Sequence, residues 1–169
     1  MREIKMHPWG FTIIELAMVI VLIAILAALA IPRFDSFYSI KLEGAARKLV
    51  ADIRYTQRLA IALHDDYGVE FNTSAETYRV YRVSDNATAT EPLSRSAYQT
   101  SFAANSEFQG IDISSASFGG TQHVRFNSLG TPRDGNNSVL SSNGTVVLSY
   151  KGNSRTITVT PNTSKVTLK

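Results

Sequence analysis

An apolar run of bilayer length that contains a single carboxylate constrains this chain more than any other feature of its sequence. Between Phe11 and Ile31 the only polar side chains are those of Thr12 and Glu15. A helix of about 20 residues rises about 30 Å, which matches the hydrocarbon thickness of a bilayer. Residues 11–31 are therefore predicted to form a transmembrane helix.

An acidic side chain inside such a segment is unfavourable, so Glu15 needs a partner. Its position less than two turns from the polar edge of the run lowers the cost without removing it. Ionisable groups within membranes usually face an opposite charge. A free α-amino group is such a charge, and at low dielectric constant it attracts a carboxylate far more strongly than in water. The sequence therefore predicts that Glu15 pairs with an amino terminus.

The residues around Glu15 resemble the class III leader of type IV prepilins and type II secretion pseudopilins. A short basic leader, residues 1–10, ends in Gly10, which is followed by Phe11, the glutamate and the apolar run. The resemblance implies that a prepilin peptidase cleaves between Gly10 and Phe11 and then N-methylates Phe11. It also implies that Glu15 neutralises the N-terminal amine of a neighbouring subunit in a helical filament.

Two other interpretations of the N-terminal region remain open. The first is an ordinary secretory signal peptide, for which Ala28-Leu29-Ala30 offers an A-x-A cleavage site. Its apolar region would then be long and would contain a glutamate, which suits that purpose poorly. The second is a plain single-span anchor in which Glu15 is tolerated near the interface.

A second helical pattern follows the apolar run in residues 32–66. Pro32 lacks an amide donor and clashes with the preceding turn, so it is predicted to end or kink the membrane helix. From Phe34 to Leu63 apolar residues recur every three or four positions, which is typical of an amphipathic helix. The sequence thus predicts one long, kinked helix whose second half has one apolar face.

From Gly68 onward the apolar residues alternate with polar ones, which indicates β-strands in a domain formed by residues 67–169. Residues 84–106 are expected to form a long loop, and residues 130–137 a turn. The strand candidates are Val69–Asn72 and Tyr78–Arg82, expected to form a hairpin, then Ile111–Ile113, His123–Phe126, Thr145–Tyr150, Ile157–Thr160 and Val166–Leu168. The predicted fold is α+β, with the long N-terminal helix packed on an antiparallel β-sheet domain.

The order of these parts resembles minor pilins and pseudopilins of the GspH/FimT group, through residues 51–62, 124–132 and 156–161. The resemblance implies a structural subunit of a type II secretion pseudopilus or a type IV pilus. Its expected partners are other pilin or pseudopilin subunits, the prepilin peptidase, the inner-membrane assembly platform and, before assembly, membrane lipid. The chain would sit in the bacterial inner membrane with a periplasmic C-terminal domain, and later in a periplasmic pseudopilus or an extracellular pilus. A major pilin is the alternative within the same superfamily.

The sequence shows no catalytic constellation, so we expect no enzymatic activity. It has no cysteine, which excludes disulfides and thiolate metal sites. The three histidines lack metal-ligand spacing, and neither a metal nor a cofactor is expected. His64 beside Asp65 and Asp66 is interpreted as a solvated helix terminus, because a general base needs a nucleophile within reach.

The basic C-terminal region suggests an alternative function, a DNA-binding minor pilin for natural transformation. Residues 121–169 carry six basic side chains against Asp134 alone. DNA-binding relatives in the FimT branch have a Gly-Arg-x-Arg pattern, whereas residues 163–167 of this chain contain one lysine and no arginine pair. That departure favours the interpretation that the basic residues of this region lie on a solvated face of the sheet and do not bind DNA. The candidates for phosphate contact are Lys151, Arg155, Lys165 and Lys169.

Overall fold

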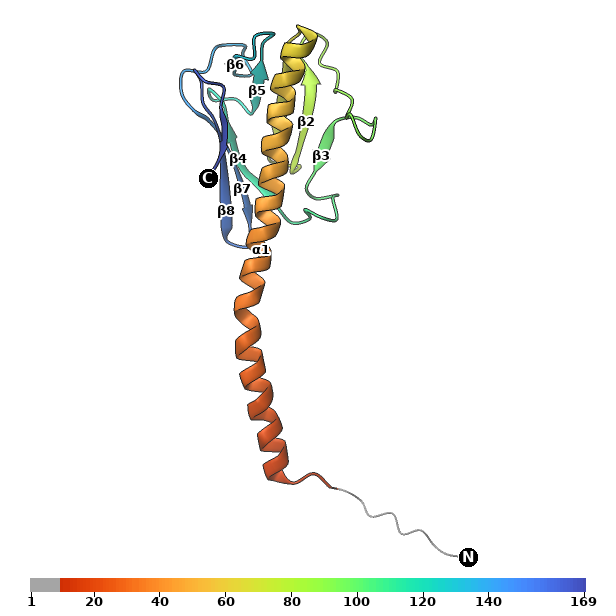
Figure 1. Ribbon diagram of the computed structural model, residues 1–169, viewed down its shortest axis with the longest axis vertical. Helices are drawn as coiled ribbons and strands as arrows, with labels where there is room; N and C mark the ends of the chain where they lie inside the picture. Colours follow the sequence, from red (N-terminus) through yellow and green to blue (C-terminus); the bar gives the residue numbers. More distant parts are fainter. Residues whose placement is uncertain (1–9) are drawn as a thin grey trace, which may run out of the picture. The chain divides into compact units, whose positions relative to one another are not determined.

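The structure, a computed structural model, describes the backbone of residues 10–169 and the side chains of this range except those of residues 29–36. The predicted leader therefore lies outside the described residues, apart from Gly10. The chain forms two compact units, the first ending at Phe37 and the second running from Tyr38 to Lys169. One helix, α1 (Ile13–Leu63), is followed by the strands β1 to β9 (Figure 1).

The helical part of the N-terminal prediction is confirmed. The backbone is helical from Ile13 onward and stays helical through Pro32, so the alternative that Pro32 ends the helix is wrong. A kink at Pro32 stays a prediction. Among the described residues, no helix meets the length and hydropathy that a membrane crossing requires.

Within the second unit, α1 buries the predicted apolar stripe. Leu42, Leu49 and Ile53 are fully buried, and they recur at helical spacing because three and four residues bring side chains to the same face. The helix ends at Leu63, followed by His64 at a φ of 50°. The amide of Asp65 donates to the carbonyl of Ala60 at 3.3 Å, which is the backbone pattern of a Schellman motif.

The first sheet has the strand order β3-β2-β1-β5-β6, and all of its pairs are antiparallel. The predicted hairpin is confirmed, with Phe71 opposite Tyr78. The strands are β1 (Tyr67–Asn72), β2 (Thr77–Arg82), β3 (Gln99–Ser101), β5 (His123–Phe126) and β6 (Pro132–Arg133). Strands β3 and β6 correct the predicted loop and turn, because two or three residues are too few to show an alternating pattern.

The second sheet has the order β4-β7-β8-β9, so the domain holds two antiparallel sheets where we expected one. Its strands are β4 (Asp112–Ser117), β7 (Gly144–Tyr150), β8 (Asn153–Val159) and β9 (Val166–Leu168). Strands β7 and β8 form a hairpin with a short connection. Lys151 and Gly152 connect the strands with φ angles of 49° and 84°, and positive φ at both residues is typical of a two-residue hairpin turn.

The two sheets and α1 share one hydrophobic core. In Figure 1 the helix runs in front, with β7 and β8 on one side of it and β2 and β3 on the other. Leu49 of the helix, Phe126 of the first sheet and Ile157 of the second are all fully buried. The α+β fold is therefore confirmed for the part of the chain from Tyr38 to Lys169.

Candidate functional site

The start of α1 carries the residues that the sequence singled out for assembly. Thr12 precedes the helix, and its Oγ1 accepts a hydrogen bond from the amide of Glu15 at 3.2 Å. Threonine followed three residues later by glutamate is the capping-box pattern, in which the cap satisfies an otherwise free amide of the first turn. A carboxylate in the first turn also complements the positive end of the helix dipole. The interpretation of the sequence missed this role of Thr12, although the spacing of Thr12 and Glu15 is visible in the sequence.

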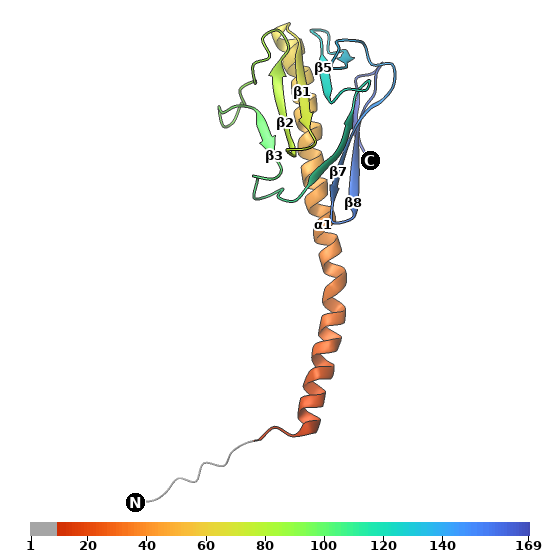
Figure 2. The same ribbon diagram turned by 180° about the vertical axis from the view of Figure 1, so that it is seen from behind.

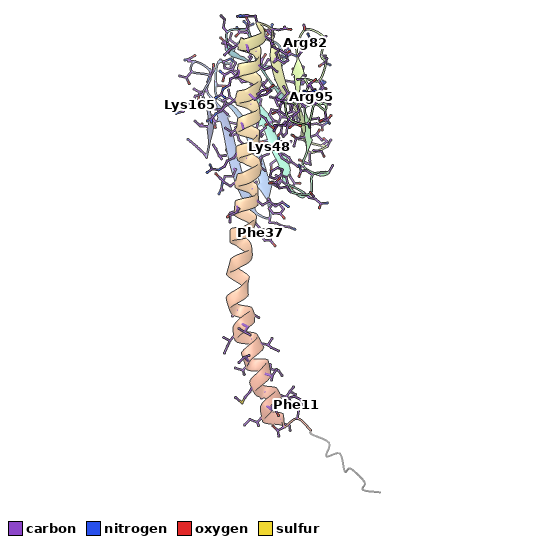
Figure 3. All side chains as sticks on the ribbon, turned by 45° about the vertical axis from the view of Figure 1, so that its right-hand side comes forward. Phe11, Phe37, Lys48, Arg82, Arg95 and Lys165 are labelled. Carbon is purple, nitrogen blue, oxygen red and sulfur yellow. The ribbon has the colours of Figure 1, made fainter. Side chains whose placement is uncertain are left out.

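The helix beyond Thr12 presents an apolar surface to its surroundings. Phe11, labelled in Figure 3, is 78% exposed, and Ile13 is 89% exposed. Exposed apolar surface of this extent marks a site of contact with protein or membrane. The Glu15 side chain is exposed as well and emerges within this surface. The exposed apolar residues are Phe11, Ile13, Ile14, Leu16, Met18, Val19, Ile20, Val21, Leu22, Ile23, Ile25 and Leu26.

The peptide bond between Gly10 and Phe11 lies at an open position. Both residues are exposed, and a Cβ added to Gly10 would have no atom of the described chain within 4 Å. Neighbouring groups therefore do not explain why a glycine stands here. Its absent side chain leaves room for another molecule to approach this bond.

The four cationic residues proposed for phosphate contact do not form one patch. Arg155 Nε lies 2.9 Å from Glu43 Oε2, and the hydrogen bond from Arg155 lowers the pKa of the Glu43 carboxyl, although that group stays largely solvated. Lys151 lies in the turn before β8. The carbonyl of Lys165 accepts a hydrogen bond from the amide of Thr160, which lies just beyond the other end of β8. Seven residues of strand separate these turns, or about 23 Å at the usual rise per residue.

The two sides of β8 divide this group further. Lys169 lies opposite Thr156 through two backbone hydrogen bonds of 2.9 Å, so it shares a face with Thr156 and not with Arg155. Figure 3 shows Lys165 on one side of α1, with Arg82 and Arg95 on the other. The structure thus does not bring the four basic residues together at one place.

Asp52 on α1 is a buried carboxylate. It is only 5% exposed and accepts hydrogen bonds from Tyr78 Oη at 2.5 Å and Tyr98 Oη at 3.0 Å. Lys48 Nζ lies 2.9 Å from its Oδ2. Burial, followed by the Asp52 charge, raises the pKa of Tyr78 well above its usual value and raises that of Tyr98 in the same direction. This cluster binds the helix to the first sheet.

The structure places His64 at the exposed C-terminal end of α1, where the sequence predicted a solvated helix terminus. This residue is exposed and ends the helix, and Asp65 Oδ1 accepts the amide of Asp66 at 2.8 Å. Among the described residues, no three potential ligands come close enough to hold a metal ion.

Comparison with known proteins identifies related chains. The family model described as type II transport protein GspH matches residues 45–164. The minor pseudopilin EpsH from the type 2 secretion system of Vibrio cholerae is similar in structure, with a TM-score of 0.55 and 14% identity over 76% of this chain and 96% of that one. The type IV minor pilin FimU of Pseudomonas aeruginosa has a TM-score of 0.51 and 14% identity over 78% of this chain and 90% of that one. No curated protein matches the sequence. At these identities the structural likeness establishes a shared fold.

Proposed function

Since the chain belongs to the GspH family of type II transport proteins, we propose that it is a minor pseudopilin or minor pilin, a structural subunit of a secretion pseudopilus or a type IV pilus. The family match over residues 45–164 carries this proposal. The exposed apolar surface of the first unit supports it independently, because a subunit that polymerises through its helix must present such a surface. The EpsH and FimU likenesses show that the fold suits both kinds of filament.

Before assembly, the apolar segment of residues 11–31 lies in the bacterial inner membrane. The basic leader stays in the cytoplasm and the second unit lies in the periplasm. The support is the continuous apolar run and the exposure of its described side chains, because exposing apolar surface to water costs about 25 cal/mol for each Å². Membrane lipid covers this surface until neighbouring subunits replace it.

The prepilin peptidase then cleaves between Gly10 and Phe11 and methylates the new terminus. The open position of Gly10 is compatible with entry of this bond into an enzyme. Cleavage removes the leader charges and creates an α-amino group on Phe11, four residues before Glu15. The inner-membrane assembly platform receives the processed subunit.

In the filament, Glu15 of one subunit pairs with the Phe11 amine of its neighbour. At a separation of about 4 Å this attraction is about 1 kcal/mol in water and about 4 kcal/mol at an effective dielectric constant of 20. The surrounding apolar side chains supply the drier medium.

Mass spectrometry of the mature N-terminus tests this proposal most directly. An N-methylated Phe11 is the expected result. A chain beginning at Ile31 would identify an ordinary signal peptide, and a chain that retains residues 1–10 would identify a plain anchor; either would contradict the proposal. The host's secretion or piliation, measured in a deletion strain with and without the wild-type gene, tests the filament role separately.

A further inference from the structure

The face of the first sheet turned away from α1 carries two arginines directly opposite each other. Arg125 of β5 pairs with Arg133 of β6 in the antiparallel register. The neighbours of Arg125, Val124 and Phe126, are fully buried in the core, so the arginine lies on the outer side of the sheet. In Figure 2, where β1 and β2 run in front of the helix, this outer side is towards the viewer.

Neither guanidinium has an acidic partner in the described part of the chain. Arg125 Nε donates to the hydroxyl of Tyr81 at 2.9 Å, and Arg133 Nη1 donates to the carbonyl of Asn137 at 3.0 Å. Both of these acceptors are neutral. The Nε of Arg133 is buried, and no acceptor for it exists among the described residues. Two like charges directly opposite on adjacent strands destabilise a sheet unless something neutralises them.

Glu70 is the acidic residue on the outer side of these five strands, and it is already engaged. Its Oε2 accepts a hydrogen bond from Arg79 Nε at 2.5 Å, and its Oε1 lies 3.9 Å from His123 Nε2. Burial lowers the pKa of His123 and the charges of Arg125 and Arg79 lower it further, against the opposing effect of Glu70. The outer side at β5 and β6 thus keeps an excess of positive charge.

Tyr81 holds Arg125 in place. The tyrosine is only 2% exposed although it lies outside the hydrophobic core, because its ring lies against Gly68, where a Cβ would approach the ring to 3.0 Å. Arg79 covers the same ring, with its Cζ 5.1 Å from the centroid. Because the Tyr81 hydroxyl is held in place, it also orients the Arg125 guanidinium, whose Nε donates a hydrogen bond to it. The Arg125 side of the site is therefore preorganised.

We propose that the Arg125–Arg133 pair binds a carboxylate presented by an acidic side chain of a neighbouring filament subunit. Guanidinium groups match the two oxygens of a carboxylate geometrically, and the two arginines occupy directly opposite positions on adjacent strands of the same sheet face. The identity of the partner as a filament subunit rests on the proposed function, whereas binding of a carboxylate does not.

Thermal unfolding of the full chain in detergent tests the carboxylate site. Sodium acetate is expected to raise the Tm of the wild type above its value in sodium chloride at equal ionic strength. Arg133→Glu supplies its own carboxylate opposite Arg125, so in chloride it should raise the Tm by about 2–4 °C and abolish the acetate response. Arg58→Gln, which removes an exposed arginine of α1, is the matched control and should keep that response.

Several outcomes would overturn the inference. One is an acetate-induced rise in Tm that is equal in the wild type and in Arg133→Glu. Another is a rise in Tm with inorganic phosphate but not with acetate. A Tm that rises with protein concentration and loses this dependence in Arg133→Glu would point to a second copy of the chain and would also overturn it. If Arg133→Glu does not fold, Arg133→Gln must likewise lose the acetate response.

A complementation experiment separates this inference from the proposed function. Wild-type protein is expected to restore secretion or piliation in the deletion strain, and Arg133→Glu to enter the sheared filament fraction about tenfold less. Failure of the wild type to restore the phenotype contradicts the proposed function. Restoration by both proteins, with equal incorporation, contradicts the partner assigned to the arginine pair alone.

Discussion

The hydroxyl of Tyr78 on β2 donates a hydrogen bond of 2.5 Å to Oδ2 of Asp52 on α1, across 26 residues of sequence. Tyr98 donates to the other carboxylate oxygen at 3.0 Å, and Lys48 approaches from the preceding helical turn. A buried carboxylate is unfavourable unless its acceptors are satisfied. Asp52 is satisfied by groups of the helix and of the domain, so its burial depends on the contact between α1 and the first sheet.

Replacing Asp52 with alanine should destabilise the domain. The change leaves two tyrosine hydroxyls and one ammonium without their acceptor, and hydrogen bonds to a charged group contribute about 1.5–3 kcal/mol each. We expect a loss of about 3 kcal/mol in the free energy of unfolding, measured by denaturant titration of the full chain in detergent. Asp112→Ala, an exposed carboxylate on β4, should change it by less than about 0.5 kcal/mol. A loss no larger than that of the control would show that the cluster contributes nothing.

The same cluster predicts a loss of stability at alkaline pH. Burial and the Asp52 charge raise the pKa of Tyr98 in the folded state above its ordinary value of 10.0. The folded protein therefore keeps a proton that the unfolded chain releases, so this stability is present below pH 10 and declines as the pH rises further. Between pH 10 and 11 the unfolding free energy of the wild type should fall by about 1 kcal/mol more than that of Tyr98→Phe. Denaturant titrations at these pH values provide the measurement, and equal slopes would contradict the assignment.

Glu15→Ala should be cleaved at Gly10/Phe11 and yet fail to assemble. In the proposed assembly, cleavage depends on the leader and the junction, whereas incorporation into the filament requires the carboxylate that pairs with the neighbouring amine. Immunoblots of processed size and of the sheared filament fraction measure the two steps. Thr12→Ala is the matched control, because it removes the helix cap, worth about 1 kcal/mol, and leaves the carboxylate in place. Equal assembly defects in both variants would mean that Glu15 acts only through the cap.

The dispersal of the basic residues predicts that the chain does not bind DNA. Arg155 is neutralised by Glu43, and Lys151 and Lys165 lie beyond opposite ends of β8. A mobility-shift titration with duplex DNA at low and physiological salt should show no complex. A complex at low salt that Lys165→Gln together with Lys169→Gln removes would restore the DNA-uptake alternative.

Prediction from the sequence succeeded where the signal is local. The stripe through Leu42 and Leu49 and the alternation in β1 and β2 each depend on residues within a few positions of one another. It failed at β3 and β6, which are too short to show a period, and it did not foresee the burial of Asp52. Helical periodicity reports the hydropathy of a whole helix face. The burial of a single carboxylate depends on partners far away in the sequence, so the periodicity does not reveal it.

The sequence by itself determined the apolar run with Glu15, the Gly10/Phe11 junction and the amphipathic helix, because periodicity and hydropathy are properties of neighbouring residues. Only the tertiary structure decided that Arg155 pairs with Glu43 across 112 residues and that Arg125 lies opposite Arg133. Such contacts depend on strand order and register, which arise when separate segments bury their apolar faces in a common core. The helix that we propose to enter the filament could therefore be predicted from the sequence, whereas the surface that we propose for a neighbouring subunit could not.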